Sequence, residues 1–433
     1  MRDLIIVLIF ASALGYGVWK KNPFVGVLVY FWISFMNPHR FSWGFAYSLP
    51  LAMGAAAVTF MTIFLNLNDI KWPKAREMGL FVFLWIFITI TTALAMYPEW
   101  AWEKWSVVNK ILLMTMVSIL VIHTKNRLIL FLFAVAVFIG AVGVKGAVFG
   151  VLTGGKYRFW GPPDSFLEDN NGLGLALVMI LPLALFLKDL FVKKWQRLAM
   201  FGIAGALAVS IVVTYSRGAL VGMVIVCMYY VAFSKHKVKV GIAALVVLVV
   251  ALSMLPPEWF DRMNTIKEGG KDDSAAMRLN SWAMSFNLAK HFPFGAGFDC
   301  FSMENYERYS PRPELGVADQ DGQAVGSTAH SIYFQVMATQ GFGGFALYMI
   351  TLISMLFSLL KLSKLGKKLP SGEWITMTSR GIMGTILGFM ASGAFLSLAF
   401  FDLFWAIYGA GICLKAIVHS GTWLHEETLP LFK

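Results

Sequence analysis

Long apolar runs, separated by short polar segments, follow one another along most of the chain. A helix rises about 1.5 Å per residue, so about 20 apolar residues cross a hydrocarbon core about 30 Å thick. The bilayer interior offers no water to the backbone, so runs of this length predict helices. The runs give thirteen candidate spans, over residues 3–19, 23–36, 49–67, 78–97, 106–123, 128–152, 171–192, 197–214, 218–234, 237–255, 331–361, 375–398 and 400–418.

The first two runs are short and are joined by "KKNP", so we expect about twelve of these candidates to span the membrane. The predicted fold is an all-α polytopic membrane protein with about 12 transmembrane helices and one large loop domain. The first run also resembles a signal peptide, but no soluble domain follows it, so we expect an uncleaved helix. The expected divisions are N-terminal helices over 1–155, core helices over 156–255, the loop domain over 256–330, C-terminal helices over 331–420 and a tail over 421–433.

Within the loop domain, apolar residues recur at helical spacing over about residues 275–290. The recurring positions are Leu279, Trp282, Phe286 and Ala289, and Ser274 is the expected N-cap. Pro293, Gly295 and Gly297 then end the pattern. The pattern predicts an amphipathic helix that lies along the membrane or covers a cavity.

The composition agrees with a membrane protein, because 58% of the residues are hydrophobic and only 14% are charged. The net charge of +12 does not indicate a nucleic-acid partner, because the basic residues cluster in every second loop, as the positive-inside rule requires. These clusters contain Lys71, Lys74 and Arg76; Lys125 and Arg127; Lys188, Lys193, Lys194 and Arg197; Lys235, Lys237 and Lys239; and Lys361, Lys364, Lys367 and Lys368. The loop domain is therefore expected on the outer face of the membrane.

Arg217 stands in the motif "VVTYSRGALVG" between two predicted spans. Twenty residues of helix from Arg197 climb about 30 Å, so Arg217 should emerge at the outer interface. The turn that holds it is short, which fixes its position. A guanidinium donates two parallel hydrogen bonds to a phosphate, although an isolated arginine here could also reach lipid headgroups by itself.

A second motif, "GSTAHSIYFQVMATQGFGG", begins the long span after the loop domain. Ser327 or Thr328 is the expected cap, which places His330 in the first turn of the helix. The positive end of the helix disfavours an imidazolium there, and a neutral imidazole can accept a proton from a hydroxyl. The alternative is an interfacial histidine that only forms hydrogen bonds.

Further cations are expected on the same outer side. Arg278 lies on the amphipathic helix, Lys145 lies near the end of a span, and Arg158 lies in "GGKYRFWGPPDSF". Each of these charges could simply be solvated. Their gathering with Arg217 on one side of the membrane nevertheless predicts that the functional side of the protein is the outer one.

Metal chemistry has a weak signal in "DQD", where Asp319 and Asp321 have the spacing of a divalent-cation motif. The chain has no cluster of His and Cys residues that would predict zinc. We therefore expect a site without a metal or other cofactor, with the Asp319 and Asp321 alternative left open.

Four motifs together resemble the O-antigen ligase/polymerase superfamily. They are "EDNNGLGLALVMILPL", "VVTYSRGALVG", "MRLNSW…HFPFGAGFDCF" and "TAHSIYFQVMATQGFGG", within about residues 155–360, and "VYFWISFMNPHRFSWGFAY" resembles the N-terminal region of O-glycosylation ligases. The resemblance implies a GT-C-like, metal-independent inverting glycosyltransferase at the periplasmic face of the bacterial inner membrane. Its donor would be a glycan on undecaprenyl diphosphate and its acceptor lipid A-core. By motif, Arg217, Arg278 and His330 would be the catalytic residues, and we expect Arg158 and Lys145 to help bind the donor.

Two alternatives remain at this stage. A polymerase or a protein O-oligosaccharyltransferase would use the same donor with a different acceptor. A transporter or flippase would instead carry charges at the bilayer midplane on broken helices and would show a repeated half, and the sequence shows no such repeat.

Overall fold

The computed structural model describes residues 2–234, 273–316 and 328–427, together with a few isolated residues between 237 and 257. All elements of this part of the chain are helical, with short 3-10 turns between the longer helices. The helices are α1 (Arg2–Trp19), α2 (Pro23–Met36), α3 (Leu51–Leu65), α4 (Arg76–Ala93), α5 (Pro98–Val121), α6 (Lys125–Leu152), α7 (Asn170–Leu187), α8 (Lys194–Val213), α9 (Arg217–Phe233), α12 (Asp273–His291), α13 (Met303–Tyr309), α14 (Ile332–Gly366), α15 (Glu373–Gly393) and α16 (Asp402–Ser420).

The predicted all-helical membrane fold is confirmed, whereas the predicted number of spans is not. Within the described residues, eight helices are long and apolar enough to cross a bilayer, namely α1, α4, α5, α6, α7, α8, α14 and α16. Three apolar helices, α2, α3 and α9, are shorter, and the predicted span 237–255 lies largely outside the described residues. The chain is therefore a multi-pass membrane protein.

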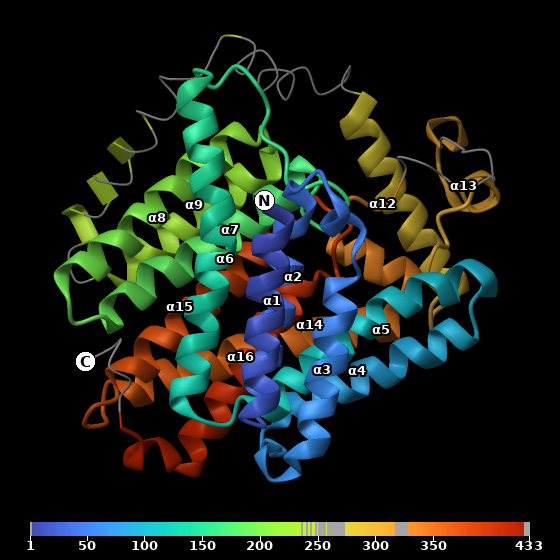
Figure 1. Ribbon diagram of the computed structural model, residues 1–433. Coiled ribbons are helices and arrows are strands. Elements are labelled where there is room, and N and C mark those ends of the chain that lie inside the picture. The colour runs from blue at the N-terminus through green and yellow to red at the C-terminus, as the bar shows by residue number, and fades with distance from the viewer. Residues whose placement is uncertain are drawn as a thin grey trace.

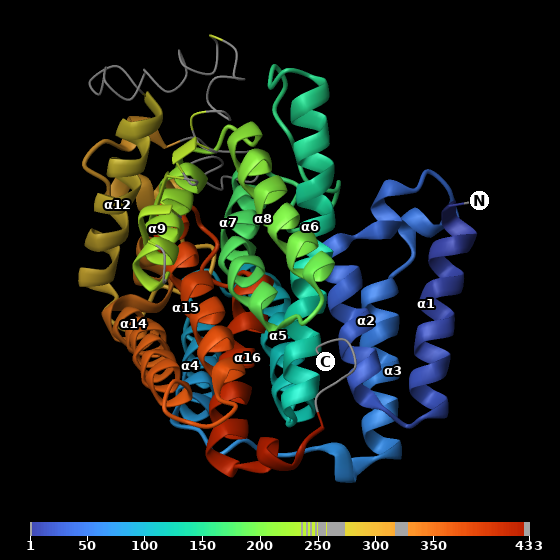
Figure 2. The ribbon, with the colours of Figure 1, turned by 90° about the vertical axis from the view of Figure 1, so that its left-hand side faces the viewer.

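Helix α7 forms the centre of the bundle. It is apolar on all sides, and every residue from 172 to 187 is buried, which is the pattern of a helix enclosed by others. Helices α6, α8, α9 and α15 pack around it. Helices α1, α2 and α3, which together we call the N-terminal hairpin, stand beside this bundle. They contact it mainly through the packing of α2 against α6 (Figure 2).

The basic segments gather at one end of the bundle, the basic end. The loop after α3 and the end of α16 lie at the bottom in both views, whereas the C-terminal end of α6 lies at the top (Figures 1 and 2). At the basic end, the N–H of Lys71 donates to the Leu120 carbonyl at 3.0 Å, and the Lys125 ammonium lies 5.6 Å from the Trp374 ring centroid. The helix ends that carry these lysines therefore meet on one side.

An ion-pair network strengthens the basic end. Asp69 accepts hydrogen bonds from Arg127 at 2.8 Å and lies 2.9 Å from the His123 ring nitrogen. Burial raises the pKa of the Asp69 carboxyl, but the hydrogen bonds from Arg127 and His123 outweigh burial and hold the pKa below its ordinary value of 3.8.

A second ion pair lies inside the bundle. Glu77 on α4 is 0% exposed, and its Oε2 accepts from the Lys415 ammonium of α16 at 2.6 Å. Its Oε1 accepts from the Ser358 hydroxyl of α14 at 2.6 Å and from Ser354 at 3.2 Å. A buried carboxylate needs such partners, so this pair fixes α4 against α14 and α16.

Helix α14 is interrupted at Gly341, whose backbone has φ 66° and ψ −173°. The segment that follows α12, residues 293–297, docks at this break. The N–H of Gly297 donates to the Thr339 carbonyl at 2.9 Å, and that of Gly343 donates to the Pro293 carbonyl at 3.3 Å. The segment predicted to form an amphipathic helix is helical, as α12, and its C-terminal end is attached directly to α14. The predicted cap and apolar face are wrong, because the helix already includes Asp273, before Ser274, and Leu279 and Phe286 are 62% and 42% exposed.

Candidate functional site

Arg217 is the first residue of α9, at the tight turn that the sequence predicts. Tyr215 has a left-handed backbone, with φ 58°, which reverses the chain direction after α8. The Tyr215 hydroxyl donates to the Gly155 carbonyl at 2.6 Å, and the Ser216 hydroxyl caps α9 by accepting from the Ala219 N–H at 3.3 Å. Both bonds fix the position from which the Arg217 side chain starts.

The "EDNNGLGL" motif packs against the same turn. Asp169 caps α7 by accepting from the N–H of Asn171 at 2.9 Å and of Gly172 at 3.0 Å. The buried Asn170 side chain donates to the Thr214 carbonyl at 2.7 Å. The polar residues before α7 therefore hold the turn that carries Arg217, which gives this motif a structural role.

Arg217 also lies next to the C-terminal end of α15. A Cβ added at Gly218 would stand 3.1 Å from the Phe395 Cβ, and one added at Gly222 would overlap the Ser392 hydroxyl. The absence of side chains at these two glycines therefore allows α9 to approach α15 closely. The loop that follows, residues 394–401, begins beside Arg217, and we call it the α15–α16 loop.

His330 contacts the same α15–α16 loop. Its N–H donates to the Ser397 hydroxyl at 2.8 Å, and Ser397 donates in turn to Thr328 Oγ1 at 3.2 Å. A second connection follows one turn later, where the Ala399 N–H donates to the Gln335 side chain at 2.9 Å. The segments that carry Arg217 and His330, more than 100 residues apart in the sequence, thus meet at one loop.

The predicted place of His330 within its helix is wrong. Helix α14 begins at Ile332 with Ser331 at the N-cap position, so His330 lies just before the helix and not in its first turn. His330 has φ 44°, a left-handed conformation that interrupts the helix before it can extend back to Thr328. The half-buried imidazole is therefore placed by a turn and by Ser397, not by a helical cap.

Helix α12 brings Arg278 toward this region. The Trp282 indole donates to the Ala329 carbonyl, next to His330, at 2.8 Å. Its ring stacks on Phe334 with centroids 5.0 Å apart and an angle of 7° between the planes. Arg278 lies one helical turn before Trp282 and therefore on the same face of α12. The contacts of Trp282 consequently place Arg278 on the side of α12 that faces the start of α14.

The two remaining predicted cations differ in position. Arg158 precedes Phe159, whose N–H donates to the Val213 carbonyl at 2.9 Å, so Arg158 lies beside the α8–α9 turn. Its guanidinium lies 5.4 Å from the Trp160 ring centroid. Lys145 instead extends toward Phe41 of the N-terminal region, with 3.7 Å between its ammonium and the ring centroid. Contacts thus connect Arg158, but not Lys145, to the segments around Arg217.

Two polar residues near the site were not recognised in the sequence. Ser397 is the hydrogen-bond acceptor for His330, and Asp402 is a buried carboxylate at the start of α16, directly after the α15–α16 loop. Asp402 Oδ1 accepts from the Leu403 N–H at 2.7 Å. An aspartate before the apolar run "LFWAIYGAGICL" is a visible signal, whereas Ser397 is one small residue in a short loop.

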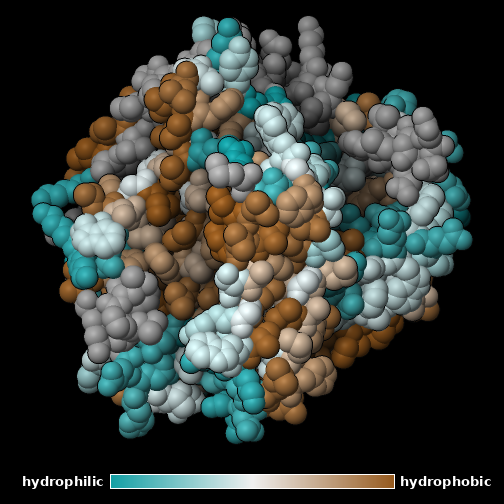
Figure 3. Space-filling view, viewed as in Figure 1, coloured by the Kyte–Doolittle hydropathy of each residue, from teal (hydrophilic) through white to brown (hydrophobic). Residues whose placement is uncertain are grey.

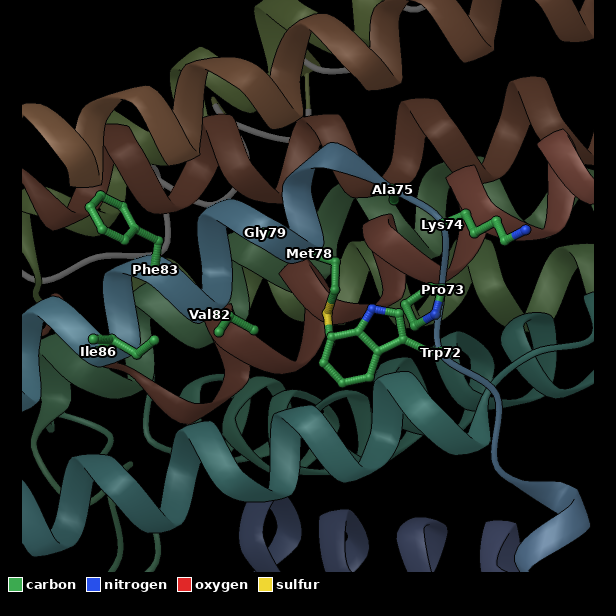
Figure 4. A pocket seen from close by; sticks show the side chains of 9 residues that line it. All are labelled: Trp72, Pro73, Lys74, Ala75, Met78, Gly79, Val82, Phe83 and Ile86. Atoms are coloured by element: carbon green, nitrogen blue, oxygen red, sulfur yellow. The ribbon is translucent and has the colours of Figure 1, made fainter.

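Two pockets on the described part of the chain lie away from the candidate site. Trp72, Pro73 and the first turns of α4 line one of about 480 Å³, in which the Trp72 ring lies beside Met78 (Figure 4). The other, of about 460 Å³, is lined by Lys71, His123 and His419 among others. Both belong to the basic end and lack the residues of the candidate site.

No group of three or more His, Cys, Asp or Glu residues that could hold a metal ion occurs in the part of the chain that the structure describes. The predicted alternative metal ligands, Asp319 and Asp321, lie outside the described residues. A site without metal therefore stays a prediction.

Comparison with known families divides the chain in two. Residues 1–191 match a family of unknown function (DUF5935), and residues 202–349 match the family described as O-Antigen ligase. No curated protein matches the chain. Arg217, Arg278 and His330 fall within the second match, whereas Lys145 and Arg158 fall within the first. Proteins of the O-antigen ligase family are ligase- or polymerase-type glycosyltransferases that act on lipid-linked glycans. The chain is thus a multi-pass membrane protein in which residues 202–349 match the O-antigen ligase family, preceded by a region that matches a family of unknown function.

Proposed function

We propose that this protein is an O-antigen ligase, which transfers a glycan from undecaprenyl diphosphate to lipid A-core during lipopolysaccharide biosynthesis. The observation that carries the proposal is the meeting of the Arg217 turn and the His330 segment at the α15–α16 loop, with Trp282 holding α12 beside them. All three predicted catalytic residues therefore start from neighbouring segments.

The proposed reaction is a single displacement with inversion. A hydroxyl oxygen of the acceptor attacks the anomeric carbon of the donor glycan, and the bond from that carbon to the diphosphate oxygen breaks. The diphosphate leaves with the bonding electron pair and gains negative charge. Arg217 and Arg278 stabilise this charge through charge-assisted hydrogen bonds, which is the role that a metal ion has in many other glycosyltransferases.

His330 accepts the proton of the attacking hydroxyl in this proposal. The hydrogen bond from its backbone to Ser397 and its left-handed turn hold the ring before the start of α14. Arg158 lies beside the α8–α9 turn and contributes to donor binding. The activated bond is already present in the donor, so the transfer needs no nucleotide, and in this proposal the two arginines take the place of a metal ion at the leaving diphosphate.

The distribution of charge supports the orientation that we propose. Basic residues cluster at the end of the bundle opposite the candidate site, and basic loops face the cytoplasm in most membrane proteins. The site would therefore face the periplasm from the bacterial inner membrane.

A reconstituted assay tests this function and separates its alternatives. The purified protein is placed in vesicles with a glycan on undecaprenyl diphosphate, and lipid A-core is added as acceptor. A ladder of glycan on lipid A-core supports the ligase. Growth of the donor glycan identifies a polymerase, and glycan on a peptide rich in Ser, Thr and Tyr identifies a protein O-oligosaccharyltransferase. If the donor is not consumed with any acceptor, the proposal of a glycosyltransferase is wrong.

A further inference from the structure

Lys145 is an exposed cation near the C-terminal end of the apolar helix α6. It lies seven residues before the last residue of α6, which places it about 10 Å from that end of the helix. Val144 and Val148, on either side of it, are 39% and 52% exposed. A charge at such a position in a membrane helix is costly and normally has an anionic or polar partner.

A second cation lies beside the first one. Arg2 Nη1 donates to the Phe41 carbonyl at 3.1 Å, while the Lys145 ammonium lies 3.7 Å from the Phe41 ring centroid. Neither cation forms an ion pair with any carboxylate in the described part of the chain. The neighbouring Asp3 accepts at Oδ1 from the N–H of Ala46 at 3.1 Å, so this carboxylate oxygen is directed to the backbone of the Phe45–Ser48 turn.

The surface around Phe41 has the composition of a membrane interface. The 3-10 turns Pro38–Phe41 and Phe45–Ser48 form a cap over the hairpin, and Trp43 between them is 98% exposed. An exposed tryptophan is typical of the level of lipid headgroups. Leu4 and Leu8 of α1 are 58% and 63% exposed, and an apolar patch covers the upper part of α1 (Figure 3).

The cap is fixed in place by the loop after α6. Asp164 accepts from Arg40 at 3.2 Å and from the Tyr47 hydroxyl at 2.5 Å, and the Arg40 guanidinium lies 4.8 Å from the Tyr47 ring centroid. The residues around Phe41 are therefore held against the loop that follows α6.

We propose that Arg2, Lys145 and Phe41 form a binding site for the phosphate headgroup of an anionic membrane lipid. The phosphate oxygens accept hydrogen bonds from both cations beside the Phe41 ring, and the acyl chains lie along the exposed apolar residues of α1 and α6. This site belongs to the region whose family has no known function, and it does not depend on the proposed glycan transfer. A bound lipid of this kind relieves the repulsion between the two cations and joins the N-terminal hairpin to the bundle.

Native mass spectrometry of the full-length protein in lipid nanodiscs tests this site. Phosphatidylglycerol is the anionic probe and phosphatidylcholine is the zwitterionic one. Arg2→Gln and Lys145→Gln should each weaken phosphatidylglycerol binding about fivefold, and the double variant about 25-fold. Lys145→Arg keeps the charge and should bind like the wild type. Lys156→Gln, which removes an exposed cation from the nearby loop, is the matched control and should also bind like the wild type.

The proposal fails if the double variant retains phosphatidylglycerol as the wild type does, or if the wild type binds phosphatidylcholine equally well. Inorganic phosphate should displace little of the bound lipid, because the acyl chains supply the rest of the affinity. Complete displacement by phosphate would show a simple anion site and would contradict the assignment to lipid. Glycan transfer by the same variants in the reconstituted assay is a separate readout, so a failure of the proposed function leaves this test intact.

Discussion

Gly341→Ala is the substitution that tests most sharply how the loop domain is attached to the membrane helices. Gly341 interrupts α14 with φ 66° and ψ −173°, a conformation that is almost confined to glycine. The added Cβ would overlap the Pro293 carbonyl oxygen and the Gly295 nitrogen of the docked segment. These are backbone atoms, so a rotation of side chains cannot remove the overlap.

The expected cost follows from these contacts. The backbone conformation alone costs an alanine about 1–3 kcal/mol. Release of the docked segment also removes the backbone hydrogen bonds of Gly297 and Gly343, each of which contributes about 1 kcal/mol. We therefore expect Gly341→Ala to detach segment 293–297 and to displace α12, which carries Arg278, while the membrane helices stay folded.

Gly343→Ala is the matched control in the same helix. Its Cβ would stand 3.5 Å from the Phe87 ring, an ordinary van der Waals contact, and its backbone is helical. Both variants are compared with the wild type for glycan transfer in the reconstituted assay and for thermal unfolding of the purified protein. Gly341→Ala should lose most of its transfer activity and unfold at lower temperature, whereas Gly343→Ala should resemble the wild type. Equal activity and equal thermal stability of the two variants would refute the role of the docked segment.

Further predictions concern single contacts. Ser397→Ala removes the hydrogen bond to the His330 backbone, worth about 1 kcal/mol, and should lower kcat for transfer about fivefold with little change in the KM for donor; an unchanged kcat would exclude a positioning role. Lys415→Met removes the cation that donates to the buried Glu77 carboxylate and leaves Arg76, whose Nη2 lies 3.8 Å from Glu77 Oε1, as the remaining cation. The free energy of unfolding should fall by about 3 kcal/mol, and the double variant with Glu77→Leu should recover much of this loss; an equal loss in the single and double variants would contradict the pairing. Because the Asp69 pKa is depressed, its stabilisation is present above pH 3.8 and is lost as the pH falls through the lower, folded-state value; Asp69→Asn should therefore destabilise at neutral pH and not at the acid end of a pH series of unfolding curves. A chelator should leave transfer unchanged in the gel assay, whereas a loss that Mg²⁺ restores would contradict the metal-independent mechanism and revive the alternative of a metal at Asp319 and Asp321.

The sequence predicted most helices because their signal is local. Runs of apolar residues and the basic loops between them determine the membrane helices, and α12 followed from the spacing of residues such as Trp282 and Phe286. The α8–α9 turn was likewise visible as a short polar interruption. Helix α5, in contrast, begins at Pro98, whereas the predicted span begins near residue 106. The prediction missed the first turns because they are rich in tryptophan and charged residues and lack the long apolar run that marks a span.

The rest of the site depends on tertiary contacts that no local pattern records. The start of α14 was misplaced because the left-handed conformation of His330 is stabilised by a hydrogen bond to Ser397, which is distant in sequence. The interruption at Gly341 was not predicted, because a glycine within an apolar run does not show that residues 293–297 dock there. The position of Lys145 against Phe41 depends in the same way on the packing of the N-terminal hairpin.

The central claim is that Arg217, Arg278 and His330 act together on a lipid diphosphate donor, and single-turnover transfer in vesicles tests it most directly. The rate is measured with the wild type, with Arg217→Ala, Arg278→Ala and His330→Ala, and with Lys290→Ala, which removes an exposed cation from the last turn of α12. We predict that each of the three substitutions lowers the rate about 100-fold or more and that Lys290→Ala leaves it unchanged. Near-normal transfer by any one of the three variants, in protein that remains folded in the membrane, would contradict the account.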